Sequence, residues 1–415
     1  MSIVVIKVVL SLLLLLAAGG VLWRKEFLQK RLADKNVPRW LTLGWVLFRL
    51  LPFVVVYIAA GIAPTSDVNG FWDEGSKASQ GMVVYRDFWS PYSPLYAYYL
   101  GAWLKIWYDP RMIVLGMTIM DALALWVSWY LYRTRLSGAE FLYKALLYYL
   151  LPGSLILCVV GAQEDVWMWL FVIVAYLYRQ RTGRVEVYAL VLAVALLLTK
   201  AIFVLILVPL FFLEKDKVRF VLVMAAVGGL SLAILYPLVG WEFTQPLDEA
   251  DTLRAPNVLS VLNPWFFNHL GVGQKIWNWV GLVVSVGAGV WTSWRFRAAG
   301  FPELISRTWV ALYATMMVIQ QSAYSNYIFL FLIPLVFFVV DWRSKTQVGL
   351  LLLFNFLCVV HPSYWWRLGM PKYLVPSDIW SSPVLALDYL MQAAIVGLTG
   401  YFVWLAVRGK MKQAI

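Results

Sequence analysis

Charge is scarce in this sequence. Of its 415 residues, 62% are hydrophobic and only 13% are charged, whereas a soluble domain carries about 25% charged residues. So few charged side chains cannot cover the surface of a soluble protein of this length. The composition excludes a soluble enzyme and predicts an all-α protein that crosses a membrane many times.

Cysteine and histidine are also rare. Cys158 and Cys358 both lie in apolar runs, where cysteine is a small packing residue, so a disulfide framework is excluded. The two histidines, His269 and His361, are too few and too far apart for a histidine-based metal site. No nucleophile triad, P-loop or dinucleotide fingerprint stands out.

The net charge of +12 comes from bases in short loops. Short basic loops between apolar runs are typical of the cytoplasmic side of a membrane protein. This placement of the bases argues against a nucleic-acid partner. The clusters are 133–135, 179–184, 214–219, 295–297, 342–345 and 408–412. All six fall inside if residues 93–108 form a helix in the outer interface and do not cross the membrane.

We therefore predict about 13 spans, with the N-terminus outside and the C-terminus cytoplasmic. The expected spans are 3–22, 40–62, 111–132, 141–160, 166–179, two short helices within 185–213, 218–239, 275–295, 305–320, 327–341, 347–360 and 388–407. The stretch 64–100 is expected on the outer face, and further outer loops are expected at 241–274 and 361–387. The chain is interpreted as one transmembrane domain, 1–415, with an extra N-terminal anchor (1–39), a catalytic core (40–345) and C-terminal helices (346–415).

The stretch 64–100 is the first long polar interruption, and Asp67 is its centre. A carboxylate at the end of an outward-running span can act as a general base or bind a cation through oxygen. The alternative is a helix cap, in which Ser66 or Asp67 begins a short helix.

Two further sites interrupt the apolar pattern. Glu164 and Asp165 lie in a short turn between spans, where two adjacent carboxylates are stable if water, a base or a metal is near. The alternative is a solvated turn that caps the next helix with negative charge. Lys200 breaks an apolar stretch and either meets a lipid phosphate or extends its head toward the membrane surface. Asp121 lies within a span, where an ion pair with Arg111, Arg86 or a base of another helix is at least as plausible as catalysis.

Later loops supply residues suited to phosphate and sugar contacts. Arg254 and Asn257 lie in the second outer loop, and Tyr324 and Asn326 lie in a turn between two spans. For most of the 23 tryptophans, an aromatic belt at the membrane surface is the better account.

The order of these motifs resembles the GT-C superfamily of polyprenyl- or dolichyl-phosphate-sugar-dependent membrane glycosyltransferases, with a mannosyltransferase-like pattern. The matching residues are Asp67, Gly81, Tyr85, Arg86, Asp87, Phe88, Ser93, Pro94 and Leu95, then Arg111 to Asp121, Glu164, Asp165, Lys200 before Pro209, and the segments 254–262 and 324–334.

The resemblance implies inverting transfer of mannose or another hexose, on the extracytoplasmic face, to a lipid-linked or glycan acceptor. Asp67 would be the base, and Lys200, Arg254 and Arg86 would hold the donor phosphate. Asn69, Asp73, Glu74, Asn257, Tyr324 and Asn326 would bind sugar or acceptor. No cofactor is certain. Glu164 and Asp165 would hold Mg²⁺ or Mn²⁺ in a metal-dependent enzyme, but Asn69 stands where several mannosyltransferases have a second aspartate.

Two other functions stay open. A transporter or flippase of lipid-linked saccharides would need charged groups along a path to both faces, and only Asp121 lies at mid-membrane among the candidate acids. A structural scaffold for other envelope enzymes would tolerate joint replacement of Asp67, Asp165 and Lys200.

Overall fold

The computed structural model describes residues 3–267 and 275–409, and this part of the chain is helical. Within it the one β-type pairing is an isolated bridge between Val84 and Phe88. The all-α class predicted from composition is confirmed. His269 and the last bases of the 408–412 cluster lie outside the described residues.

The chain folds into two compact units, each assembled from separate segments. Unit 1 contains 1–25, 150–156 and 250–415, and unit 2 contains 26–149 and 157–249. The boundaries differ from the predicted division at 39 and 345, which stays a prediction.

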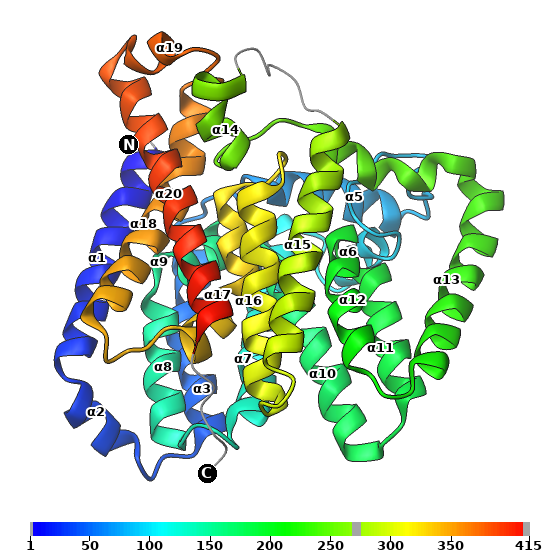
Figure 1. Ribbon diagram of the computed structural model, residues 1–415, viewed down its shortest axis with the longest axis horizontal. Coiled ribbons are helices and arrows are strands. Elements are labelled where there is room, and N and C mark those ends of the chain that lie inside the picture. The colour runs from blue at the N-terminus through cyan, green and yellow to red at the C-terminus, as the bar shows by residue number, and fades with distance from the viewer. Residues whose placement is uncertain (1–2, 268–274, 410–415) are drawn as a thin grey trace. The chain divides into compact units, whose positions relative to one another are not determined.

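Unit 2 begins with a span assembled from α-helical and π-helical pieces and ends with the long helix α13. Figure 1 shows α11 beside α10 and α13, with short connections between them. Its elements are α2 (Lys25–Leu32), α3 (Val37–Trp45), η1 (Val46–Leu50), α4 (Leu51–Phe53), η2 (Val54–Ala59), α5 (Asp67–Ser79), α6 (Tyr96–Leu104), α7 (Pro110–Tyr132), α8 (Gly138–Leu150), η3 (Ile156–Val160), α10 (Val166–Thr182), α11 (Val185–Leu198), η4 (Ala201–Phe203), α12 (Val204–Leu213), α13 (Lys217–Val239) and η5 (Gly240–Asp251).

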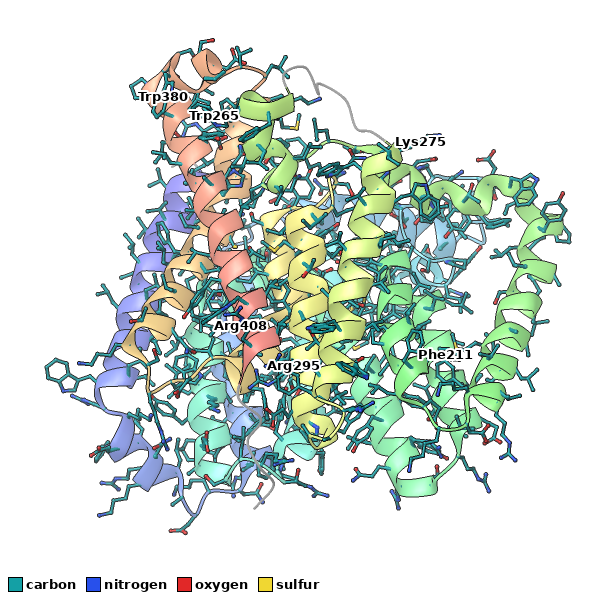
Figure 2. The ribbon with its side chains drawn as sticks, in the orientation of Figure 1. Phe211, Trp265, Lys275, Arg295, Trp380 and Arg408 are labelled. Atoms are coloured by element: carbon teal, nitrogen blue, oxygen red, sulfur yellow. The ribbon has the colours of Figure 1, made fainter. Side chains whose placement is uncertain are left out.

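Unit 1 carries tryptophans toward one end and arginines at the helix ends opposite. Trp265 and Trp380 lie together at one end, and Arg295 and Arg408 close α15 and α20 at the other (Figure 2). Its elements are α1 (Ile3–Trp23), α9 (Pro152–Leu155), α14 (Val258–Leu262), η6 (Asn263–Phe267), α15 (Lys275–Arg295), α16 (Phe301–Ile319), η7 (Ser325–Tyr327), α17 (Ile328–Pro334), η8 (Leu335–Val339), α18 (Lys345–Arg367), α19 (Pro376–Trp380) and α20 (Pro383–Arg408).

Six helical stretches in the described part of the chain are long and apolar enough to cross a membrane, or seven if one bent pair is counted as a span. They are Ile3–Trp23, Val37–Ala59, Pro110–Tyr132, Lys217–Asp251, Lys345–Arg367 and Pro383–Arg408, with Gly138–Leu150 and Pro152–Val160 as the bent pair. These are the helices of an integral membrane protein. The predicted total of about 13 spans is not confirmed, because several of the expected spans form shorter helices.

Two expected loops contain helix. The loop predicted at 361–387 holds the end of α18, the short helix α19 and the start of α20. The loop predicted at 241–274 begins with η5 and holds α14, whose first turn is closed by Asn257. Hydropathy marks where a membrane helix can end, but a polar sequence can continue as helix beyond that point.

Two irregular features were predicted correctly. Residues 93–108 do not form a spanning helix, since α6 has only 9 residues. The stretch 185–213 is broken into α11, η4 and α12, with Lys200 at the break between α11 and η4.

Close glycine contacts hold α6 in place. A Cβ added to Gly116 on α7 would lie 1.6 Å from a ring atom of Trp103, so this ring occupies space that only glycine leaves free. A Cβ on Gly101 would lie 3.0 Å from the Gly75 carbonyl oxygen of α5. The two short helices therefore pack as a pair and fix the connection between them.

Asp121 forms a fully buried ion pair with Arg49, a base on another helix as the sequence allowed. Arg49 Nε donates to Asp121 Oδ2 at 2.9 Å, and the Tyr148 hydroxyl donates to Oδ1 at 2.5 Å. Arg49 lies in η1, and Tyr57 in η2 donates to the Val159 carbonyl of η3 at 2.9 Å. These contacts tie together the two chain segments that lead to Asp67 and to Glu164.

Candidate functional site

Asp67 is the first residue of α5, as the capping interpretation expected, but its side chain also makes a long-range contact. The carboxylate is exposed, and a negative charge in the first turn is favoured by the helix dipole. The preceding residue, Ser66, has φ +65° and makes no side-chain cap. A residue with a Cβ in this left-handed region is strained, and such strain is concentrated at functional sites.

The second acidic turn shows the same backbone feature. Ala162 has φ +48°, and Gln163, Glu164 and Asp165 follow it directly into α10. These three polar side chains are only 3%, 2% and 1% exposed. A solvated turn, which the sequence allowed, is therefore wrong for this segment.

Gln163 joins the two turns. Its Nε2 donates to Asp67 Oδ2 across 96 residues of sequence. The same nitrogen donates to the Gly161 carbonyl at 3.4 Å. Sequence reasoning missed Gln163, although its position directly before the acidic pair was a usable signal.

Lys200 is held by the acidic pair. Its Nζ lies 2.6 Å from Glu164 Oε1 and 2.7 Å from Asp165 Oδ1, and 5.8 Å from the centre of the Tyr92 ring. Its charge is thus already opposed by two carboxylates. A role for Lys200 in holding a phosphate stays a prediction, and it would require competition with these acids.

Glu74 is a fourth carboxylate, buried on the inner face of α5. The Ser90 hydroxyl donates to its Oε2 at 2.6 Å. Burial raises the pKa of Glu74 to about 8, and the charges of Glu164 and Asp73 add to the effect, whereas Ser90 and Lys77 oppose it. Glu74 is therefore largely protonated at neutral pH.

We name the group Asp67, Glu74, Glu164, Asp165 and Lys200 the acid cluster. Burial raises the pKa values of Glu164 and Asp165 above their ordinary range, although the adjacent Lys200 lowers both. The charge of Asp67 contributes to the shift of Asp165. Glu164 and Asp165 thus share one ammonium, and Asp67 adds a further carboxylate beside them.

Aromatic rings cover the acid cluster. Tyr92 and Tyr96 stack with ring centroids 4.2 Å apart, and Phe71 and Trp167 contact Tyr96 at 5.6 and 5.7 Å. Burial raises the pKa of Tyr92 well above its usual value, and the charge of Glu164 adds to this. Tyr96 is fully buried, so of these two tyrosines only the partly exposed Tyr92 can offer a ring face or a hydroxyl to a sugar.

The predicted metal pair is not a complete metal site by itself. Within residues 3–267 and 275–409, no group of three or more histidine, cysteine or acidic side chains lies close enough to hold an ion. The position between the Glu164 and Asp165 oxygens is taken by the Lys200 ammonium. Metal use through these two carboxylates stays a prediction.

The remaining predicted residues of unit 2 lie on its surface. Arg86 pairs with Asp87 at 2.9 Å, and this contact lowers the pKa of Asp87 to about 2. Asp73 pairs with Lys77 at 2.6 Å one turn along α5. Asn69 is exposed on the same helix. The ion pairs of Arg86 and Asp73 lie outside the acid cluster, and Asp73 acts on it through its charge effect on Glu74.

Arg254, Asn257, Tyr324 and Asn326 belong to unit 1. The Arg254 guanidinium lies 4.3 Å from the centre of the Tyr324 ring, and its backbone N–H donates to the Gln321 carbonyl at 2.8 Å. Asn257 caps α14, where Oδ1 accepts from Ser260 and Nδ2 donates to two carbonyls. Its amide is fully used, which favours a structural role over sugar binding.

A shallow pocket opens beside Arg254 in unit 1. Its lining includes Arg254, Ser260, Trp365, Tyr373 and Gln392. Behind it lies a buried network in which Tyr373 and Gln392 donate to Asp388 Oδ2 at 2.9 and 2.7 Å, and His361 lies 3.4 Å from Oδ1. His361 therefore lies beside a buried acid.

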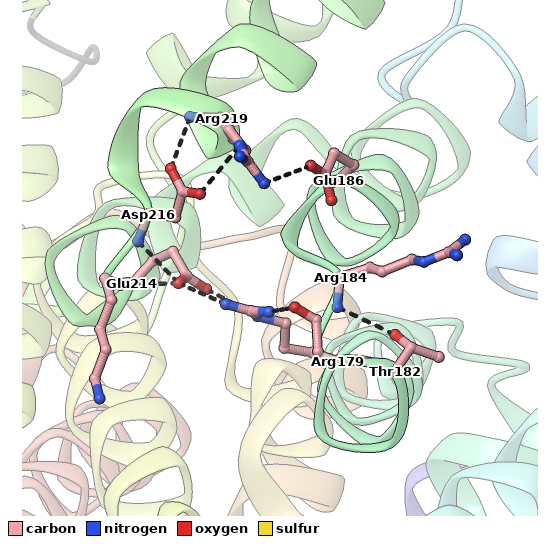
Figure 3. A network of polar contacts seen from close by, with 9 residues as sticks. Arg179, Thr182, Arg184, Glu186, Glu214, Asp216 and Arg219 are labelled. Carbon is pink, nitrogen blue, oxygen red and sulfur yellow. Dashed lines mark hydrogen bonds and ion pairs between the residues drawn. The ribbon is translucent and has the colours of Figure 1, made fainter.

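The other end of unit 2 carries paired surface charges. Arg179 binds Glu214 at 3.1 Å, and Arg219 binds Glu186 and Asp216, each at 3.3 Å (Figure 3). Burial alone would raise the pKa of Glu214, but the hydrogen bond and charge of Arg179, together with the backbone N–H groups of Lys215 and Asp216, outweigh burial and lower the pKa. The basic clusters 179–184 and 214–219 are thus joined across the α10–α11 and α12–α13 turns.

Comparison with protein-family models and with curated proteins finds no match for this chain. The acid cluster is therefore interpreted from its own geometry.

Proposed function

We propose that this protein is a membrane-embedded glycosyltransferase that takes a sugar from a polyprenyl-phosphate donor, with Asp67 as the general base. The observation that carries this proposal is the arrangement of Asp67. It is the exposed carboxylate of a cluster whose other three carboxylates are buried, and Gln163 holds one of its oxygens. An exposed, oriented carboxylate can accept a proton from an acceptor hydroxyl as that oxygen attacks the sugar carbon.

The charge balance of the acid cluster supports a neutral substrate group beside Asp67. Lys200 is held by Glu164 and Asp165, and Asp67 adds a further carboxylate beside them. A sugar, rich in hydroxyl donors, suits such a site better than a phosphate does. The donor phosphate would then be held by a base outside the cluster, for which Arg86 of the same unit is a candidate.

The order of motifs supports the GT-C-like interpretation of this cluster, and with it an inverting reaction. The ends of α10 support the sidedness: the acidic turn precedes its first residue, and Arg179 and Arg181 lie in its last turn. Since bases gather on the cytoplasmic side, the acid cluster would face the extracytoplasmic side. The N-terminus would be outside, with about 13 spans in total.

The test is a transfer assay with the full-length protein in lipid nanodiscs. Labelled polyprenyl-phosphate sugars are supplied with a lipid and glycan acceptor extract, with and without EDTA. We expect Asp67→Asn to lose at least about a hundredfold in rate, since it removes a general base. Asp34→Asn, an exposed change of the same kind in the α2–α3 connection, should keep full activity. Full transfer by a folded Asp67→Asn protein would exclude this assignment.

A flippase remains the competing class. The mid-membrane acid Asp121 is closed off by Arg49 and Tyr148, which gives no support to a charged path through the membrane. Movement of a labelled lipid-linked saccharide across reconstituted vesicles, without any transfer product, would favour that class instead.

A further inference from the structure

Gln163 is a neutral amide placed between two acid-bearing turns. It is 3% exposed, and its Nε2 donates to Asp67 Oδ2 and to the Gly161 carbonyl. Asp67 by contrast is exposed, and Oδ1 has no hydrogen bond to another side chain or backbone group of the described residues. One carboxylate oxygen of Asp67 is therefore held by a hydrogen bond, and the other can meet a substrate.

The hydrogen bond between Gln163 and Asp67 joins two turns that both have strained backbone. Ser66 and Ala162, which directly precede Asp67 and Gln163, both have positive φ. Each conformation costs energy for a residue with a Cβ, and such conformations persist when surrounding contacts demand them. The shared feature indicates that both turns are bent to bring these two side chains together.

The chemical type of the side chain at position 163 also affects Asp67. The charge of Asp67 acts on three titratable groups, Tyr92, Tyr96 and Asp165. Lys200 and Glu164 pair directly beside Asp165, and the charges of Glu74 and Glu164 also act on Tyr92 and Tyr96. A lysine at position 163 would pair with Asp67 and weaken it as a base, and a glutamate would repel it. An amide orients the carboxylate without changing the charge of the cluster.

We propose that Gln163 is a positioning residue that holds Asp67 Oδ2 and so directs Oδ1 toward the acceptor hydroxyl. This role rests on the proposed transfer reaction, but the contact can be tested without any substrate.

The first experiment measures the protonation of Asp67 directly. The full-length protein in nanodiscs is treated with a carbodiimide and an amine at a series of pH values, and labelling of the peptide containing Asp67 is measured by mass spectrometry. We expect Gln163→Glu to move the labelling midpoint up by about one pH unit, because a second carboxylate disfavours ionisation. Gln80→Glu places the same charge at an exposed position just after α5 and should leave the midpoint unchanged. An unchanged midpoint in Gln163→Glu would overturn the proposal.

The second experiment separates orientation from binding. Gln163→Met keeps a side chain of similar length but removes the donor, and we expect kcat to fall about 10- to 100-fold with KM changed less than about threefold. In Gln163→Glu the acid limb of the kcat profile should move to higher pH, by the same amount as the labelling midpoint. A loss confined to KM would contradict the positioning role. The labelling midpoint could shift in Gln163→Glu while the wild type transfers no sugar. That result would support the contact between Gln163 and Asp67 and would exclude the proposed function.

Discussion

The two ends of helix α10 hold charge in opposite ways. Before its first residue, Glu164 and Asp165 are buried and share the single ammonium of Lys200. In its last turn, Arg179 binds Glu214, and the neighbouring Arg219 is matched by two acids on the surface. The ends are separated by 17 residues, or roughly 25 Å of helix.

The difference separates two uses of charge. Exposed pairs are screened by water and contribute little to stability, so the surface network at the basic end serves mainly to connect loops and to mark one side of the membrane. Buried, unbalanced charge is expensive and persists when something else requires it. This contrast is our reason for placing the chemistry at the acidic end.

The largest effect is expected when the base is removed from the acidic end of α10. Lys200→Met leaves two buried carboxylates without a counter-charge, and we expect a loss of about 3–5 kcal/mol in the free energy of unfolding near pH 8. The loss should shrink toward pH 5, because the pKa values of Glu164 and Asp165 are already raised and protonation removes the repulsion. Thermal unfolding in nanodiscs at both pH values measures it. A variant as stable as wild type at pH 8 would contradict the buried ion pairs.

The buried carboxyl of Glu74 predicts a smaller, pH-dependent effect. With a folded-state pKa of about 8, Glu74 keeps its proton in the folded protein while the unfolded chain releases it. The unfolded state then binds fewer protons than the folded state. Glu74 therefore lowers the free energy of unfolding progressively as the pH rises from the ordinary glutamate pKa, about 4.3, toward 8.

Glu74→Gln mimics the protonated form and should remove that part of the pH dependence. We expect its melting temperature to exceed that of the wild type at pH 8 and to approach it at pH 5. Equal slopes of melting temperature against pH in the two proteins would show that Glu74 is not held protonated.

The smallest effect is expected at the basic end. Arg219→Met breaks two contacts whose side chains are 40–64% exposed, and it should cost less than about 1 kcal/mol. Added salt should reduce the difference further, because exposed charges are screened. A loss comparable to that of Lys200→Met, measured in the same unfolding experiment, would remove the contrast between the two ends.

Much of the local architecture could be predicted. Hydropathy located the apolar spans, and the polar pair Thr199–Lys200 marked the break between α11 and η4. The short helix α6 followed from its length and from the placement of basic loops. Predictions failed where polar sequence continued as helix, as in the end of α18 and in η5.

The candidate site was only partly predictable. The acids at 67, 164 and 165 and the base at 200 were identified because charge is rare in this chain, and rarity is a local property. Their grouping was not identified. The sequence interpretation paired Lys200 with a phosphate, placed Glu164 and Asp165 near water, a base or a metal without naming Lys200 as that base, and gave Gln163 no role.

The sequence by itself determined that this is a helical membrane protein, with Asp67, Glu164 and Asp165 at interruptions of the apolar runs and clusters of bases in short turns. Hydropathy and charge order act residue by residue along the chain, so they can be read without a structure. Only tertiary structure decided that Asp67 meets Gln163, that Lys200 lies between two acids, and that Asp121 pairs with Arg49. These contacts join residues 96, 35 and 72 positions apart, and the packing of whole helices against one another sets which side chains meet.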